Sequence, residues 1–399
     1  MKTGPDGRLD LAYCLNVHPG ESWAENVEAM QTHVPAVREA VAPGMAFGLG
    51  LRVGSRALRE LREGNARAEA ADWFRQADLY PFTINGFPYG EFHRASVKET
   101  VYQPDWQTAE RRDYTIGLGG LLADWLPEGG EGSISTVPGS YAVWITRPDQ
   151  AGAMARNLAE TALAFARLEE TTGRLVHLGL EPEPDCFLQT TAETIRFFEE
   201  VLLREGTAHL MQTAGMDRGR AETVLRRHAG VCFDTCHLAL QEENLADSFR
   251  AFGRAGLRIS KVQISCALEI DPTSEGWEAL RPFVEPVYLH QVKALRRDGG
   301  LASWPDLPPA LEDGPALSEE LRRARVHFHV PLFFGGAGPL RSTSSTLTPE
   351  FFEVLRRGDC RHVEIETYTF DVLPASIKPA TLTESLIREY QWLLPRLRE

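Results

Sequence analysis

The regular alternation of short apolar runs with longer amphipathic stretches constrains the fold of this chain more than any other feature. Between the runs, apolar residues recur at spacings of three and four, as in Trp23, Val27, Met30 and Val34, which is typical of one helical face. Strand and helix repeated about eight times predict a parallel sheet. No Gly-rich phosphate fingerprint follows the first run, which favours a closed (β/α)8 TIM barrel over an open sheet. The apolar runs occupy 11–17, 46–53, 80–85, 132–137, 175–181, 230–234, 258–265 and 362–367.

The segment 266–325 breaks this alternation. It is rich in proline and glycine and contains a turn signal at Asp298-Gly-Gly300. We expect one barrel domain over 1–399, with 266–325 inserted after the seventh strand and an extra hairpin near Pro286 to Val292. Arg325 to Phe334 is a further strand-like run.

Composition excludes several classes of function. The chain has 399 residues, with 42 Lys+Arg against 56 Asp+Glu, a formal charge of −14. Such a balance argues against nucleic acid or an anionic membrane as the main partner. No apolar stretch approaches the roughly 20 residues that a membrane helix needs, and the start of the chain has no signal-peptide pattern. The six scattered cysteines indicate free thiols in a reducing compartment, so we expect a cytoplasmic protein.

Carboxylates end several of the late strands. Glu181 closes the fifth run, Asp234 the sixth and Glu366 the eighth. The carboxyl ends of barrel strands meet at one face, so these side chains are expected to converge. Their mutual repulsion would be costly without a cation, which predicts a site for Mn²⁺, Mg²⁺, Co²⁺ or Zn²⁺.

Histidines and other polar residues lie close to the same strand ends. His237 follows Asp234 by three residues. Glu183 either binds the metal in place of Glu181 or supports a residue that binds it. His327 and His329 point to the same side of a strand, where they either chelate a metal or are two satisfied polar residues.

Two further residues are candidates for lining the pocket or contacting the substrate. His18 follows the first strand and is a candidate pocket residue. Lys261, on the seventh strand, either contacts an anionic group or forms a salt bridge.

These motifs resemble a known superfamily. Gly230-Val-Cys-Phe-Asp-Thr-Cys-His237 resembles the sixth-strand motif of the xylose isomerase-like barrels, which include sugar isomerases, ketose 3-epimerases, inosose dehydratases and metal-dependent apurinic endonucleases. Glu181 and the run Glu364-Ile-Glu366 extend the match. Nearly the whole chain, including Asn16-Val-His-Pro-Gly-Glu-Ser-Trp23, also resembles the EboE family of metabolite traffic proteins.

The resemblance implies a ligand set. Glu181, Asp234, the seventh-strand position and Glu366 would hold one divalent metal, and Gln263 stands where the superfamily usually has a histidine. An amide oxygen is a harder ligand than imidazole, which favours Mn²⁺ or Mg²⁺.

Further histidines extend the comparison with the nucleases. The pair His327 and His329 resembles an Asp-x-His element of those enzymes, so these two residues with His237 could form a second site. The epimerase resemblance instead implies that His237 contacts the substrate or supports the ligands of the first metal. The other histidines of the nuclease cluster are not evident.

Three functions remain open from the sequence. The favoured hypothesis is an isomerase or epimerase of a small polyhydroxylated molecule or secondary metabolite, with Glu181 and Glu366 as the acid/base pair. The second is metal-assisted phosphoester hydrolysis, which the acidic charge disfavours. The third is a non-catalytic metabolite-binding protein that cooperates with other products of the same operon.

Overall fold

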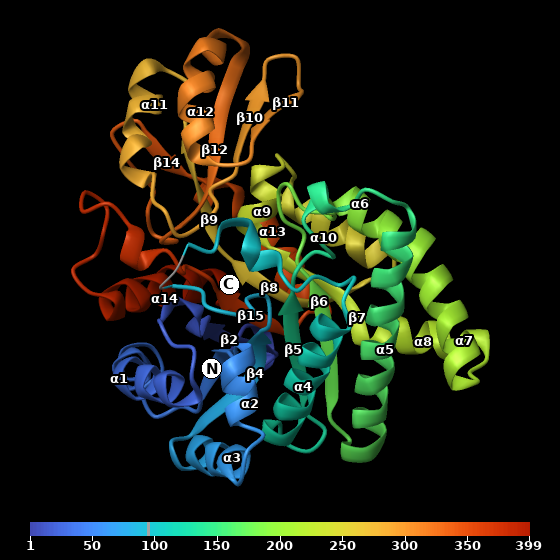
Figure 1. Ribbon diagram of the computed structural model, residues 1–399. Coiled ribbons are helices and arrows are strands. Elements are labelled where there is room, and N and C mark those ends of the chain that lie inside the picture. The colour runs from blue at the N-terminus through green and yellow to red at the C-terminus, as the bar shows by residue number, and fades with distance from the viewer. Residues whose placement is uncertain (94–95) are drawn as a thin grey trace.

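Eight parallel strands form the barrel that the sequence predicts (Figure 1). The computed structural model describes residues 1–93 and 96–399. The hydrogen-bonded order runs β2, β15, β8, β7, β6, β5, β4, β3, and a parallel bridge between Cys14 and Gly50 joins the two edges. The barrel strands are β2 (Leu9–Tyr13), β3 (Phe47–Arg52), β4 (Leu79–Asn85), β5 (Glu131–Thr136), β6 (Leu175–Leu180), β7 (Ala229–Asp234), β8 (Arg258–Ile264) and β15 (His362–Ile365).

Helices surround the barrel and begin at local capping signals. Ser22 and Glu25 form the predicted capping box at the start of the first helix, and Thr108 caps α4. The long α5 ends at Gly173, whose positive φ of 67° favours glycine. The helices of this layer are α1 (Trp23–Val41), α2 (Ser55–Glu60), α3 (Ala66–Gln76), α4 (Ala109–Trp125), α5 (Asp149–Thr172), α6 (Thr191–Arg196), α7 (Thr207–Ala214), α8 (Arg218–His228), α9 (Thr235–Leu240), α10 (Leu245–Arg254), α13 (Pro349–Arg357) and α14 (Leu382–Arg398).

The insertion after β8 is a second, antiparallel sheet that forms the orange lobe at the top of Figure 1. Its strands extend from 266 to 342, so it is longer than the predicted 266–325. The expected hairpin near 286–292 lies slightly later, between β10 and β11, and turns at the predicted Asp298-Gly-Gly300. The lobe comprises β9 (Cys266–Ile270), α11 (Ser274–Ala279), β10 (Val292–Arg296), β11 (Leu301–Trp304), α12 (Leu307–Asp313), β12 (Leu321–Val330), β13 (Gly336–Ala337) and β14 (Leu340–Ser342).

Strand β12 links this lobe to the barrel mouth. It contains the strand-like run that the sequence shows at Arg325 to Phe334, but it belongs to the inserted sheet. Its last residue, Val330, pairs with Cys266, which follows barrel strand β8 after a single residue. The C-terminal end of β12, with His327 and His329, is therefore held beside the carboxyl ends of the barrel strands.

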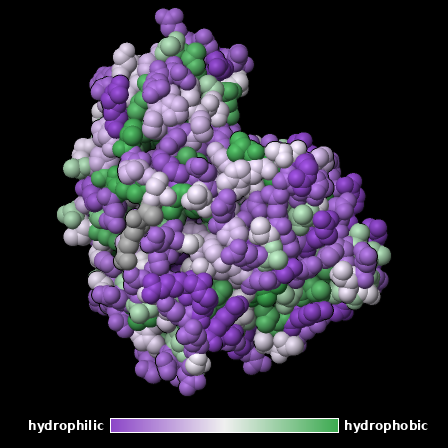
Figure 2. Space-filling view, in the orientation of Figure 1, coloured by the Kyte–Doolittle hydropathy of each residue, from purple (hydrophilic) through white to green (hydrophobic). Residues whose placement is uncertain are grey.

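The surface and core agree with the composition. Most of the face in Figure 2 is hydrophilic, with hydrophobic residues gathered in patches near the junction of lobe and barrel. All six cysteines are buried free thiols, as predicted. In the described part of the chain, no helix is both long and apolar enough to cross a bilayer.

Candidate metal centre

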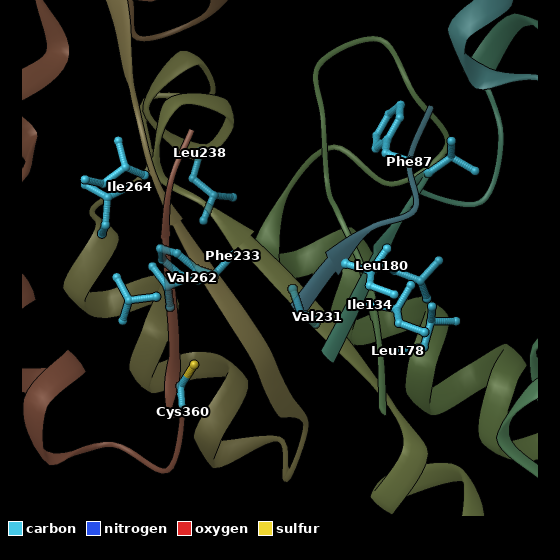
Figure 3. Packing of buried hydrophobic residues seen from close by; sticks show 14 of the residues in the cluster. Phe87, Ile134, Leu178, Leu180, Val231, Phe233, Leu238, Val262, Ile264 and Cys360 are labelled. Carbon is cyan, nitrogen blue, oxygen red and sulfur yellow. The ribbon is translucent and has the colours of Figure 1, made fainter. Parts of the chain in front are cut away.

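Successive side chains of each barrel strand point alternately towards the surrounding helices and towards the barrel interior. Figure 3 shows Val231 and Phe233 of β7 with Val262 and Ile264 of β8 in the hydrophobic cluster. The residues between them therefore face the barrel interior. The thiol of Cys232 meets the amide oxygen of Gln263 across two such strands at 2.8 Å, in agreement with this orientation.

Three buried carboxylates converge at the carboxyl ends of the strands. Glu181, Asp234 and Glu366 each offer an oxygen within 4.8 Å of the other two, and each is at most 3% exposed. Asp234 caps α9: its Oδ1 accepts from the backbone N–H groups of Cys236 and His237 at 2.7 and 3.0 Å. The predicted convergence of these three residues is thus present.

The carboxylate group has no buried lysine or arginine partner among the described residues. Nδ1 of the His237 imidazole lies 3.7 Å from Glu181 Oε1. Burial, and then repulsion from neighbouring carboxylates, raises the pKa of Glu181 and of Glu366 well above the usual range. Burial also opposes ionisation of Asp234, yet His237, His329 and the Ser265 hydroxyl together lower its pKa.

The unused oxygens of this group fit a divalent cation. Glu181 Oε2 and Asp234 Oδ2 are buried and have no hydrogen-bond partner within residues 1–93 and 96–399. Such atoms are rare in folded proteins unless a water or an ion satisfies them. Three carboxylates are ligands that Mg²⁺ and Mn²⁺ accept, and an additional imidazole would suit Zn²⁺ or Co²⁺.

Gln263 lies beside the carboxylate group, and the structure gives it another partner. Its Oε1 accepts the thiol hydrogen of Cys232, whereas Ser265, two residues further along, donates to Asp234 at 2.7 Å. Gln263 pairs in register with Glu364 on one side and with Asp234 on the other, so its backbone lies level with a candidate metal ligand although its side chain bonds Cys232. Ser265 is thus the side chain of this segment that touches a candidate metal ligand.

Three histidines form a second cluster beside the first. The Nε2 atom of His327 lies 3.1 Å from that of His237 and 3.2 Å from that of His329. Their Nδ1 atoms face oxygen acceptors, namely the carbonyls of Pro182 and Glu366 and Oε1 of Gln291. Each Nδ1 therefore carries the hydrogen, and three Nε2 lone pairs point at one another.

This second cluster also has the composition of a metal site. Burial, and then the neighbouring histidines, lowers the pKa of His327 well below its usual value, and burial above all lowers that of His237 to about 4. Neutral imidazoles cannot relieve converging lone pairs, whereas a cation can. Asp234 belongs to both clusters, since it also groups with His237 and His329.

A cavity opens onto both clusters. Glu181, Glu183, Glu366, His237 and His327 are part of its wall. Glu183 is held by Tyr102, whose hydroxyl donates to its Oε1 at 2.6 Å. Burial raises the pKa of Glu183 to about 8.

Two predicted pocket residues have other positions. His18 lies beneath α1, where its ring stacks on His33 and its Nε2 meets the hydroxyl of Tyr13 at 3.1 Å. The short 3₁₀ turn Leu15–Val17 directs it there. Lys261 is fully buried inside the barrel and bonds Glu364 at 2.5 Å, so it is a salt-bridge residue and does not reach the cavity.

Sequence reasoning missed several polar residues of the site. Asn16 and Asn85 each donate to Glu366 Oε1 at 2.9 Å. Asn85 ends the apolar run 80–85, and that position was a usable signal. Gln291 fixes both His327 and Glu183, but nothing in the sequence distinguishes it within the insertion.

The chain is similar to a solved TIM barrel of the xylose isomerase-like class, which agrees with the fold described above. A barrel protein of that class from Mycobacterium smegmatis, solved with magnesium, aligns over 98% of this chain and 96% of its own, with 11% identity and a TM-score of 0.51.

Two other structures align at slightly lower scores. The probable 3-DHS dehydratase AsbF of Bacillus anthracis aligns over 96% of this chain and 98% of its own, with 13% identity and a TM-score of 0.49. The IOLI protein with a bound zinc atom aligns over 98% of both chains, with 10% identity and a TM-score of 0.48. No family model and no curated protein matches the sequence.

Proposed function

We propose that this protein is a metal-dependent isomerase or epimerase of a small hydroxy-carbonyl compound. The observation that carries the proposal is the buried, uncompensated group Glu181, Asp234 and Glu366 at the mouth of a barrel. Burial and the neighbouring carboxylates raise the pKa of both glutamates, and a carboxyl group with a raised pKa is suited to accept and return a proton.

Each residue of the group has a separate task. A divalent ion held by Asp234 and the two glutamates would polarise a substrate carbonyl and make the neighbouring C–H group more acidic. Asn16 and Asn85 orient Glu366 through its Oε1. Glu181 and Glu366 then remove and return a proton at the carbon next to the carbonyl. The fold is shared by many chemistries, so the argument depends on this site.

Exchange of carbon-bound hydrogen with solvent deuterium tests the proposal directly. Wild-type protein loaded with Mn²⁺ is expected to incorporate deuterium next to the carbonyl of hydroxy-ketones, detected by NMR. Glu181→Gln and Glu366→Gln should each lower that rate by about 10³-fold or more, with the fold retained. Exchange that persists in both variants, or that never occurs in a broad panel of hydroxy-ketones, would refute the acid/base assignment.

A second candidate function is two-metal phosphoester hydrolysis, which the histidine cluster favours. Asp234 lies between the two clusters, as a residue shared by two ions would. Elemental analysis distinguishes the candidates: one metal per chain supports the isomerase, whereas two, with turnover of bis(p-nitrophenyl) phosphate, support the hydrolase. His329→Ala should remove one of two ions and leave a single one unaffected.

The finer role rests on the sequence motifs alone. The EboE resemblance suggests that the protein processes or binds a secondary metabolite together with other products of the same operon. Ligand binding that survives in Glu181→Gln, in the absence of any exchange activity in wild type, would favour such a binding role.

A further inference from the structure

The cavity has two chemically different ends. Its floor consists of the carboxylates, imidazoles and amides described above. Its mouth is apolar and aromatic, formed by Phe92, Val97, Val101, Tyr288, Leu289 and Tyr368. A ligand that fills the cavity therefore meets polar groups at one end and hydrocarbon at the other.

Part of the apolar mouth forms a cluster apart from the barrel core, whereas Val101 and Leu289 also pack against that core. Phe92, Val97 and Tyr288 form their own buried group, against which Tyr368 packs. The rings of Phe92, Tyr288 and Tyr368 lie 5.1–5.4 Å apart. Three segments distant in sequence supply these residues: the loop after β4, the inserted lobe and the loop after β15.

Loop packing alone leaves part of this surface unused. Val101, Leu289 and Tyr368 line the cavity yet stay only half-buried. A ligand that covers this open apolar surface gains about 25 cal/mol of binding free energy per Å² buried.

The described side chains of the wall do not attract anionic ligands. Among the described lining residues, Lys98 is the one lysine, and there is no arginine. The Lys98 Nζ is already bound to Asp306 Oδ2 at 2.7 Å. Glu181, Glu183 and Glu366 supply carboxyl groups to the same cavity, so in the metal-free protein a phosphate or carboxylate on the ligand would find no free cation among the described lining residues.

We propose that the site binds an uncharged hydroxy-carbonyl or polyol head that carries an apolar substituent of about the size of an aromatic ring. The head lies among Glu181, Glu366 and the two asparagines, and the substituent covers Val101, Leu289 and Tyr368. The assignment of the head to the reacting end rests on the proposed function, whereas the preference for an apolar substituent rests on the mouth alone.

Calorimetric titration with matched probes tests this preference without any turnover. Phenyl β-D-glucopyranoside and methyl β-D-glucopyranoside share a head and differ in the substituent. The phenyl compound is expected to bind about 10- to 100-fold more tightly, because covering an aromatic ring contributes about 1.5–3 kcal/mol. Glucose 6-phosphate should bind no more tightly than glucose.

Variants at the mouth locate the effect. Val101→Asn and Leu289→Asn should reduce the phenyl-to-methyl ratio to within about threefold and leave the affinity for the methyl compound nearly unchanged. Val143→Asn is the matched control, since Val143 is 69% exposed and lies outside the cavity wall. It should retain the full ratio.

The results separate this inference from the proposed function. Equal affinities for the two glycosides, tighter binding of the phosphate, or no measurable binding of the phenyl compound would overturn the inference. A clear phenyl preference in a protein that catalyses no deuterium exchange would retain it and remove the isomerase. Exchange activity without that preference would retain the proposed isomerase function and overturn the inference.

Discussion

Two layers of buried carboxyl groups lie inside the same barrel, and they are neutralised differently. In the lower layer, Glu364 is bound by Lys261 at 2.5 Å, and both side chains are fully buried. In the upper layer, Glu181, Asp234 and Glu366 converge without such a partner in the described chain. Glu364 and Glu366 are two residues apart, so one strand contributes to both layers.

This difference distinguishes a structural ion pair in the lower layer from a candidate metal site in the upper layer. A buried ion pair is self-contained, because each charge compensates the other. Its surroundings are closed as well: a Cβ at Gly50 would lie 1.9 Å from Glu364 Oε1, so glycine is required beside it. Buried oxygens without a hydrogen-bond partner occur in both layers, Glu364 Oε1 below and Glu181 Oε2 and Asp234 Oδ2 above, but only the upper ones lie next to a cavity and lack an ion-paired lysine in the described chain.

Replacement of Lys261, the cationic side chain of the lower layer, should have the largest effect on stability. Lys261→Met leaves Glu364 charged and buried, and we expect the free energy of unfolding to fall by about 3–5 kcal/mol. Chemical denaturation measures this change. The double variant Lys261→Met, Glu364→Leu should recover most of the loss. If the single variant were as stable as wild type, the lower layer would not be the self-contained pair described here.

Replacement of Glu181, a carboxylate of the upper layer, should change the free energy of unfolding in the opposite direction. In metal-free protein at pH 8, Glu181→Gln is expected to raise the free energy of unfolding by about 1–4 kcal/mol, because it relieves repulsion among buried carboxylates. With Mn²⁺ present, wild type should become the more stable of the two, since the variant lacks a ligand. Denaturation with and without metal checks this crossing. A variant less stable than wild type in both states would contradict the comparison.

The late strand ends were predictable because their chemistry is local. Glu181, Asp234 and Glu366 each close an apolar run, and a parallel barrel brings such ends together. The ligand role of Gln263 stays a prediction, because its amide oxygen bonds Cys232 while its strand position is level with Asp234. His18 was misplaced because a short turn follows its strand.

Other features depend on contacts between segments distant in sequence. Lys261 and Glu364 are 103 residues apart, and their pairing has no local signature. The inserted sheet was underestimated because its short antiparallel strands resemble loops and hairpins in the sequence. The histidine pair was recognisable, but its meeting with His237 required the path of β12.

The two layers should also differ in their response to pH. Folding raises the pKa of Glu181 and Glu366 above their ordinary value of 4.5, so the metal-free folded state binds more protons than the unfolded state. Their contribution to stability is therefore fully present below about pH 4.5 and is lost as pH rises towards the folded pKa values.

The comparison with Glu181→Gln isolates this effect from other titrating groups. The stability advantage of the metal-free variant should be close to zero near pH 4.5 and should grow as the pH rises to 8. Denaturation at several pH values measures it. An advantage that is constant with pH would mean that Glu181 does not titrate in this range.

The smallest predicted effects come from two matched serines, one in each layer. Ser133 donates to Thr83 Oγ1 at 2.8 Å below, and Ser265 donates to Asp234 Oδ1 at 2.7 Å above. Either Ser→Ala change removes a buried hydrogen bond and should cost about 1 kcal/mol of stability. Only Ser265→Ala should also weaken Mn²⁺ binding, by less than about tenfold, because two backbone N–H groups still hold Asp234. Calorimetric titration with Mn²⁺ measures this, and equal weakening by Ser133→Ala would mean that the layers are coupled and that the lower pair also tunes the metal centre.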